Sequence, residues 1–278
     1  MTTTATTTTT MRPPNAVALG LARGAVEIKT FFRQRDAVVF TFSLPAVLLL
    51  VLGSVSSGEL RDTGITASQL FTAGMIAGGV ASTSFVNLGI GIATDRDDGT
   101  LKRLRGTPMP PLSYFIGKVV LVLVASFAEV AVLLAVGALF FDLALPTDFS
   151  RWLTFAWVFL LGVTACSLLG IAGSSVARTA RSAPAVMNLP FLVLQFVSGI
   201  YVIPVRNLPG PLVQIGSLFP LKWMAQGFRS VFLPDSVVDQ EITGAWEHGR
   251  VAVVLAAWCI GGLVLCLTTF RWRGRRDR

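Results

Sequence analysis

The chain has 278 residues, of which 53% are hydrophobic and only 14% are charged, and its mean hydropathy is +0.69. Soluble domains carry about 25% charged residues, so this composition excludes an ordinary soluble protein and indicates an integral membrane protein. The net charge of +8 is spread between apolar runs without a zinc-binding or RNA-binding signature, and three cysteines with one histidine offer no disulfide framework, so nucleic acid and metal sites are excluded.

The chain begins with a Thr-rich stretch that offers no apolar area to bury, so we expect a disordered tail over residues 1–14. This stretch lacks the charged start and apolar core of a signal peptide, so the first hydrophobic span is expected to stay in the mature protein. Residues 15–36 mix apolar side chains with four basic ones, which is typical of an amphipathic interfacial helix in the lipid headgroup region. A solvated linker helix is the alternative, because the apolar stripe is imperfect.

Six runs that are uncharged or nearly so follow, and each is long enough to cross a bilayer as a helix of about 20 residues. They cover residues 37–58, 63–94, 119–141, 152–177, 182–205 and 251–270. A further run over 207–221 is too short to cross and contains three prolines. It predicts a re-entrant or interfacial piece inside an outer segment over 204–248.

The basic residues are distributed unevenly between the two sides of these runs. With the amino terminus inside, 17 of the 23 Lys and Arg residues fall on the inner side, which predicts that both termini are cytoplasmic. The expected fold is therefore all-α, with an interfacial helix followed by a six-span domain over 37–278 in the plasma (inner) membrane.

The longest inner loop, over 95–114, is highly charged and predicts a short helix over 98–105 that lies parallel to the membrane. Asp97 or Asp98 can cap this helix, and its two leucines share one side. Such a helix is suited to docking a soluble partner. The alternative is that its basic residues only follow the positive-inside rule, and the spacing leaves both interpretations open.

Two stretches of the sequence resemble the ABC type-2 exporter permeases. The first, over 95–118, has an acidic start followed by G-T-L, R-L-R and T-P, and Lys118 stands ten residues beyond that proline. The second, over 196–234, contains S-G, L-P, F-P-L, F-R and L-P in the order found after the fifth span of such permeases. The resemblance covers nearly the whole chain after Pro14 and is nearest in kind to the drug-resistance permeases of the daunorubicin exporter type.

The resemblance implies a transport subunit that is not itself an enzyme. ATP and Mg would bind to a separate ABC ATPase subunit, and the chain has no G-x-x-x-x-G-K-[ST] motif. It also implies a homodimer or a pair with a related permease, an inner loop that docks into a groove on the ATPase, and a segment that re-enters the membrane from outside. The expected coupling residues, with leucines in the groove and arginines at its acidic rim, are Asp97, Asp98, Leu101, Arg103, Leu104 and Arg105.

Polar groups inside the predicted spans are few. Glu129 stands near the middle of the third span, where it is either a cation or proton site or a structural hydrogen bond to a neighbouring helix. Polar, aromatic and small residues recur at helical spacing on the second and fifth spans, and these stripes either line a substrate path or pack helices together. The resemblance implies that both spans face the path, and the candidate path residues are Met75, Ser82, Phe85, Asn188, Phe191 and Gln195.

The expected function is thus the permease subunit of an ATP-driven exporter that moves a small hydrophobic or amphiphilic compound out of the cell by alternating access, as in multidrug efflux and antibiotic resistance, with membrane lipids as its surroundings. Export of a lipid-linked polysaccharide or a lipid is the alternative within transport. A membrane anchor or signalling subunit would not need six spans and a docking loop. An intramembrane enzyme would need a catalytic constellation, and the spans offer one glutamate and no histidine.

Overall fold

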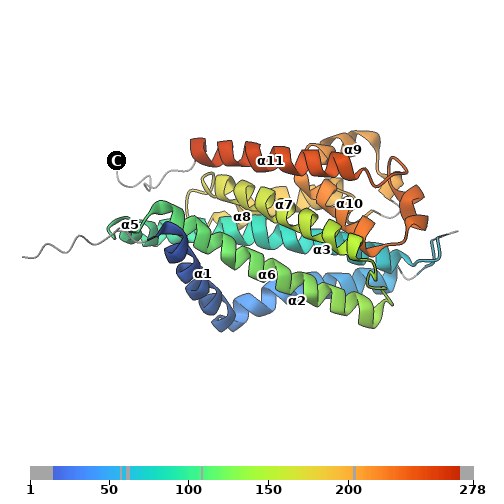
Figure 1. Cartoon of the computed structure of the whole chain (residues 1–278), viewed down its shortest axis with the longest axis horizontal. Coiled ribbons are helices and arrows are strands. Elements are labelled where there is room, and N and C mark those ends of the chain that lie inside the picture. The colour runs from blue at the N-terminus through green and yellow to red at the C-terminus, as the bar shows by residue number, and fades with distance from the viewer. Residues whose placement is uncertain (1–14, 57, 61–62, 108, 203–204, 270–278) are drawn as a thin grey trace, which may run out of the picture.

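The computed structural model describes residues 15–56, 58–60, 63–107, 109–202 and 205–269, so the Thr-rich tail over 1–14 lies outside the described residues. The described residues form an elongated bundle of helices and contain no β-strand (Figure 1). Its helices are α1 (Ala16–Arg33), α2 (Arg35–Val55), α3 (Ala67–Ala81), the π-helix η1 (Ser82–Asn87), α4 (Leu88–Asp97), α5 (Thr100–Arg105), α6 (Pro111–Phe140), α7 (Phe149–Ser174), α8 (Ala183–Val197), η2 (Val205–Asn207), α9 (Gly210–Ser217), α10 (Pro220–Phe232), η3 (Asp235–Gln240) and α11 (His248–Thr269).

Five helical segments among the described residues are long and apolar enough to cross a membrane. They are Arg35–Val55, Ala67–Asp97, Pro111–Phe140, Phe149–Ser174 and His248–Thr269. Their starts follow local sequence signals: Thr66 and Gln69 form a reciprocal capping box before α3, and Pro111 occupies the first turn of α6. The structure therefore confirms an all-α architecture with several apolar spans, as the hydropathy pattern predicts.

The fifth predicted span is shorter in the structure than in the prediction. The run over 182–205 is helical only as α8, whose 15 residues extend about 22 Å, less than the roughly 30 Å hydrocarbon core of a bilayer. Pro190 lies inside this helix, and Gly199 follows it with φ of +71°, a left-handed conformation that ends the helix. The six-span count depends on α8 and stays a prediction, as does the orientation of the termini.

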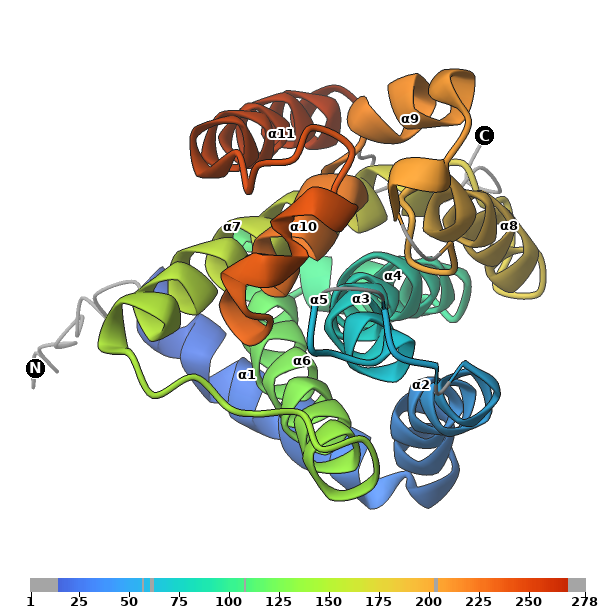
Figure 2. The same ribbon diagram turned by 90° about the vertical axis from the view of Figure 1, so that its right-hand side faces the viewer.

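The segment after α8 contains two further helices, α9 and α10, which are joined by Leu218 and Phe219. All thirteen residues of α10 are buried, because this helix packs against both α3 and α7 (Figure 2). The turn before α10 lies beside α11, where the Phe219 ring stacks on the Trp258 ring at 6.1 Å between centroids. The re-entrant or interfacial piece expected over 207–221, within the outer segment 204–248, stays a prediction, and the buried helix that follows it extends to Phe232.

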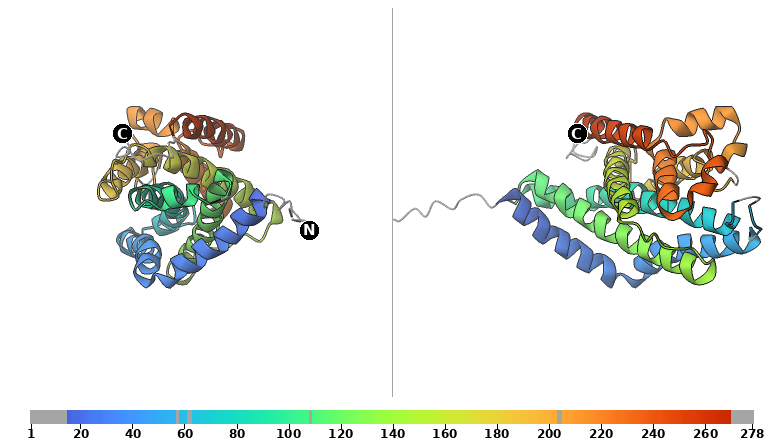
Figure 3. Two further views of the ribbon diagram at one scale, coloured as in Figure 1. Left: turned by 90° about the vertical axis from the view of Figure 1, so that its left-hand side faces the viewer. Right: turned by 45° about the vertical axis from the view of Figure 1, so that its right-hand side comes forward.

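The first two helices, α1 and α2, meet at an elbow at Gln34. Helix α1 packs against the first turns of α6, where Gly20 and Gly24 leave room for Ile116 and Val120. Helix α2 then runs along the bundle away from the end that carries α5 (Figures 1 and 3). An interfacial position for α1 stays a prediction.

A π-helix interrupts the second span between α3 and α4. This element, η1, lies against α7 at Gly170, where a Cβ atom would be 2.7 Å from the Phe85 carbonyl oxygen. π-Helical turns are rare and often occur at functional sites, so η1 makes the middle of this span a candidate functional region.

Candidate functional site

The short helix α5 lies at one end of the bundle, beyond the ends of α4 and α6 (Figure 1). Gly99, with φ of +73°, makes the turn from α4 into α5, and Gly106 follows the last helical residue. Lys102 and Arg103 are exposed to solvent on this helix. The structure thus confirms the predicted short helix, with bounds of Thr100–Arg105.

Two details of α5 differ from the prediction. Its N-cap is Gly99, and neither Asp97 nor Asp98 caps it, because both aspartates stand at the end of α4. Leu101 is only 1% exposed and belongs to the main buried core, so it anchors α5 to its own bundle and is not free to fill a groove on another chain. Leu104 is half-buried and packs against the same core.

A set of five side chains, which we call the charged cluster, joins the middle of α1, the last turn of α4 and the first turns of α6. The Lys118 Nζ atom lies 2.8 Å from Asp95 Oδ2 and 2.9 Å from Glu27 Oε2. The Tyr114 hydroxyl donates to Asp95 Oδ2 at 2.8 Å, and Arg23 Nη2 lies 2.8 Å from Glu27 Oε1. Two cations therefore balance two carboxylates, which makes the burial of the Lys118 ammonium tolerable.

The residues after Asp95 attach the end of α4 to the opposite side of the bundle. Arg96 Nη2 donates to the carbonyl oxygens of Ser174 at 2.8 Å and Ala177 at 2.5 Å, at the end of α7. The backbone N–H of Ala180 donates to Asp97 Oδ2 at 2.9 Å. A cation beside terminal carbonyls is favourable at the carboxyl end of a helix. Three consecutive residues thus hold the end of α4 to α6 on one side and to the end of α7 and the α7–α8 connection on the other, and Lys118 extends the first link to Glu27 of α1.

The predicted coupling residues therefore have different surroundings. Asp97 is engaged within the chain, and Arg103 Nη2 donates to the Asp98 carbonyl oxygen at 3.1 Å while its side chain stays exposed. The side chain of Arg105 lies outside the described part of the structure. The described coupling residues thus differ in burial and in bonding, and their coupling role stays a prediction.

Glu129 lies deep in α6 and is 1% exposed. Its Oε2 atom accepts a hydrogen bond of 2.6 Å from the Thr83 hydroxyl of η1, which joins the third span to the π-helix. Its Oε1 atom has no hydrogen-bond partner among the described residues and faces Gly79 of α3, where a Cβ atom would be only 2.8 Å away. The hydrogen bond to Thr83 supports the structural interpretation of Glu129.

We expect Glu129→Gln to retain transport and to leave the free energy of unfolding within about 1 kcal/mol of the original, because the amide oxygen can still accept from Thr83. Glu129→Ala removes the acceptor and leaves a void, and should destabilise the protein by about 2 kcal/mol. Thermal unfolding of the detergent-purified variants and a transport assay would measure both effects. A stable Glu129→Gln protein that no longer transports would instead identify this carboxyl as a proton or cation site.

The predicted path residues do not share one environment in this chain. Met75, Phe191 and Gln195 are buried, Ser82 and Phe85 are half-buried, and Asn188 is exposed. Gln195 Oε1 accepts from the Tyr201 hydroxyl at 3.0 Å, and the Gln195 amide lies against Gly78 of α3. Packing between the second and fifth spans is therefore visible at Gln195, while the path role of the six residues stays a prediction.

The sequence pattern does not single out Glu27 or Tyr114, and Lys118 enters it only as part of a motif. Glu27 is the single acidic residue within α1, and Lys118 directly precedes the apolar run over 119–141. Such a charge needs an ionic partner if the fold buries it. The sequence does not indicate, however, that these two residues, 91 positions apart, are partners.

Comparison with known proteins identifies one family. The family model described as "ABC-2 type transporter" matches residues 24–233, more than half of the chain. The protein named "Probable multidrug ABC transporter permease YbhR" from Escherichia coli (strain K12) is 24% identical to this chain over 157 residues, and its counterpart from Escherichia coli O157:H7 matches equally. This similarity covers 56% of the chain and 42% of each relative, so the chain spans less than half of the relatives that it matches.

Proposed function

The chain belongs to the ABC-2 type transporter family, and on that premise we propose that it is the permease subunit of an ATP-driven exporter. A separate ABC ATPase chain binds ATP and Mg, and a second copy of the permease or a related permease completes the membrane part. The cargo is a hydrophobic or amphiphilic compound of the drug or antibiotic class, a proposal supported by the name of the multidrug permease relatives.

The observation that carries this proposal is the seating of α5. The helix presents Lys102 and Arg103 to solvent while Leu101 anchors it to the bundle core. An exposed basic rim on a firmly anchored short helix suits docking to an acidic surface of a soluble partner. The docking contact is therefore proposed to be mainly polar, with half-buried Leu104 as its nearest apolar group.

The charged cluster would transmit a movement of the docked α5 to other helices of the bundle. When ATP binding draws the ATPase subunits together, α5 moves with them and displaces the end of α4. Asp95 pairs with Lys118 of α6, Lys118 in turn pairs with Glu27 of α1, and Arg96 is bonded to the end of α7, so these helices follow the movement together. Alternating access of a path beside the second and fifth spans is the proposed result.

The test is a double charge reversal, Lys102→Glu with Arg103→Glu. Like charges facing an acidic groove should reduce co-purification of the ATPase at least tenfold and abolish ATP-dependent uptake of an amphiphilic dye into inside-out vesicles. Insertion and yield of the permease should stay unchanged, because both side chains are exposed.

The matched control changes the same amount of charge in the predicted outer segment, which is not part of α5 or its loop. Arg206→Glu with Arg250→Glu alters two exposed arginines of the outer segment and should leave ATPase association intact. Retention of the ATPase and full transport by the α5 variant would contradict the proposal and would leave α5 as a topology signal alone.

A further inference from the structure

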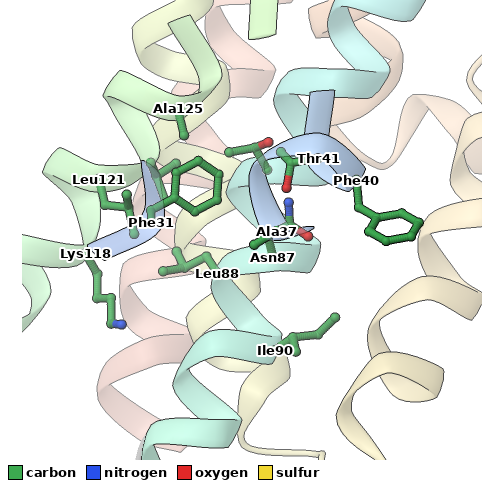
Figure 4. Close-up of a pocket in the computed structure, with 12 residues that line it drawn as sticks. Phe31, Ala37, Phe40, Thr41, Asn87, Leu88, Ile90, Lys118, Leu121 and Ala125 are labelled. Carbon is green, nitrogen blue, oxygen red and sulfur yellow. The ribbon is translucent and has the colours of Figure 1, made fainter. Parts of the chain in front are cut away.

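A cavity of about 360 Å³ lies between the elbow of α1 and α2, the helices η1 and α4, and the first half of α6 (Figure 4). Figure 4 shows Phe31 and Leu121 on one side of it and Ala37, Thr41 and Asn87 on the other. Most of its lining is apolar. The lining therefore suits a hydrocarbon ligand, and the cavity has a few polar side chains at its edges.

The cavity exists because α2 contacts the bundle over only half of its length. The buried residues of α2 are Pro45, at its midpoint, and Leu49 and Gly53 beyond it. The first half stands away from the bundle, and Phe40, which borders the cavity, is 74% exposed. In a membrane the cavity would open sideways to the lipid rather than to water.

The cavity reaches from the end of the bundle that carries α5 toward the middle of the spans. Lys118 of the charged cluster borders it, and so does Thr83, the hydrogen-bond partner of Glu129 deep in α6. With α5 on the cytoplasmic side, this length corresponds to the inner leaflet. Water would find few polar partners there, and an empty apolar space beside lipid would lose dispersion contacts, so a lipid chain is the natural occupant.

We propose that this cavity holds one acyl chain of an inner-leaflet phospholipid as a resident lipid, with its anionic headgroup at the elbow. Arg33 and Arg35 flank Gln34 there with exposed side chains, and Lys29 lies one turn earlier, while Asp36 is the neighbouring acidic residue. The excess of basic charge favours an anionic headgroup at the membrane surface. Lys118 is engaged by Asp95 and Glu27, so the elbow arginines are assigned to the phosphate.

The test places the purified full chain in phosphatidylcholine nanodiscs that contain phosphatidylglycerol with a diazirine in the middle of one acyl chain. Mass spectrometry after irradiation should find cross-links at cavity-facing residues of α6, such as Leu121 and Ala125. Two variants fill the cavity from opposite walls, Ala37→Phe on α2 and Ala125→Phe on α6. Each should reduce these cross-links at least fivefold and leave labelling of the lipid-exposed Ile260 on α11 unchanged.

Because two variants fill the cavity, the test stays decisive if one of them does not fold. The labelling experiment uses the permease without its ATPase, so its result is independent of the proposed transport function. Labelling of Ile260 without labelling of the cavity in the original chain would overturn the proposal. Unchanged cavity cross-links in a folded filling variant would also overturn it, as would displacement of the probe by excess amphiphilic dye or protection by a second permease copy.

Replacing both elbow arginines, Arg33→Gln with Arg35→Gln, tests the headgroup assignment. The double variant should at least halve the preference for phosphatidylglycerol over a phosphatidylcholine probe, and an unchanged preference would refute the assignment.

Discussion

Lys118→Met should be the most damaging single change at the α5 end of the bundle. The Lys118 side chain is 9% exposed and binds both Asp95 and Glu27, so its loss leaves two carboxylates facing each other. Removing one partner of a buried ion pair costs about 3–5 kcal/mol, and the partial exposure of the carboxylates favours the lower end of that range. The midpoint of thermal unfolding of the purified protein should fall by about 10 °C. Transport should be lost even where some protein folds.

Two companion variants separate this electrostatic effect from a general loss of charge. Lys118→Met combined with Asp95→Asn should recover a large part of the lost stability, because Glu27 keeps its ion pair with Arg23. Lys29→Met removes the same charge from an exposed position and should change the unfolding free energy by less than about 0.5 kcal/mol. A Lys118→Met protein as stable as the original would show that the charged cluster does not hold these helices together.

Gly170→Ala should destabilise the bundle, although alanine is normally the better helix residue. A Cβ atom at this position would lie 2.7 Å from the carbonyl oxygen of Phe85 and 3.0 Å from that of Ser84. Both obstacles are backbone atoms of η1 and cannot move aside as a side chain would, so α7 and η1 must separate. Overpacking of this kind costs about 1–3 kcal/mol, and Gly170→Leu should prevent accumulation of folded protein.

The same substitution in α11 provides the control, because a Cβ atom at Gly261 would meet nothing within 4 Å. Gly261→Ala should be neutral or stabilise the helix by about 0.5–1 kcal/mol. The two changes are chemically identical and are expected to have opposite signs. Equal unfolding midpoints for the two variants would show that the close approach of α7 to the π-helix has no energetic importance.

Much of this fold could be predicted from hydropathy, because a segment that crosses a bilayer needs about 20 apolar residues whatever its neighbours are. Helices α2, α6, α7 and α11 follow that rule. Helix α10 does not, because it contains Lys222, Gln226 and Arg229 and has only 13 residues. Its burial depends on partners elsewhere in the chain, such as the ion pair between Arg229 and Glu241, and a polar sequence does not reveal such pairs.

The candidate site was predictable to a similar extent. The charge of the loop and the start and end signals of a short helix identified α5, because these signals are local. The inward orientation of Leu101 and the pairing of Lys118 with Glu27 were not predictable, since both depend on how α1, α4 and α6 are placed against one another. Local rules therefore identify which residues are charged or apolar, and tertiary packing decides which of them a partner can reach.

The position of α10 in the chain also determines the order in which the protein can be completed. During synthesis, α3 and α7 leave the ribosome well before residues 220–232, yet they are the two helices that α10 packs against. A nascent chain that ends before Pro220 can insert these spans, but Gly162 of α7 and its neighbours then lack the helix that covers them. Such an unfinished bundle exposes unpaired helix faces within the membrane and is open to proteolysis or aggregation. The bundle can therefore be completed only after α10 has been synthesised. A chain interrupted before α10 differs from a complete one because α3 and α7 lack the helix that packs between them.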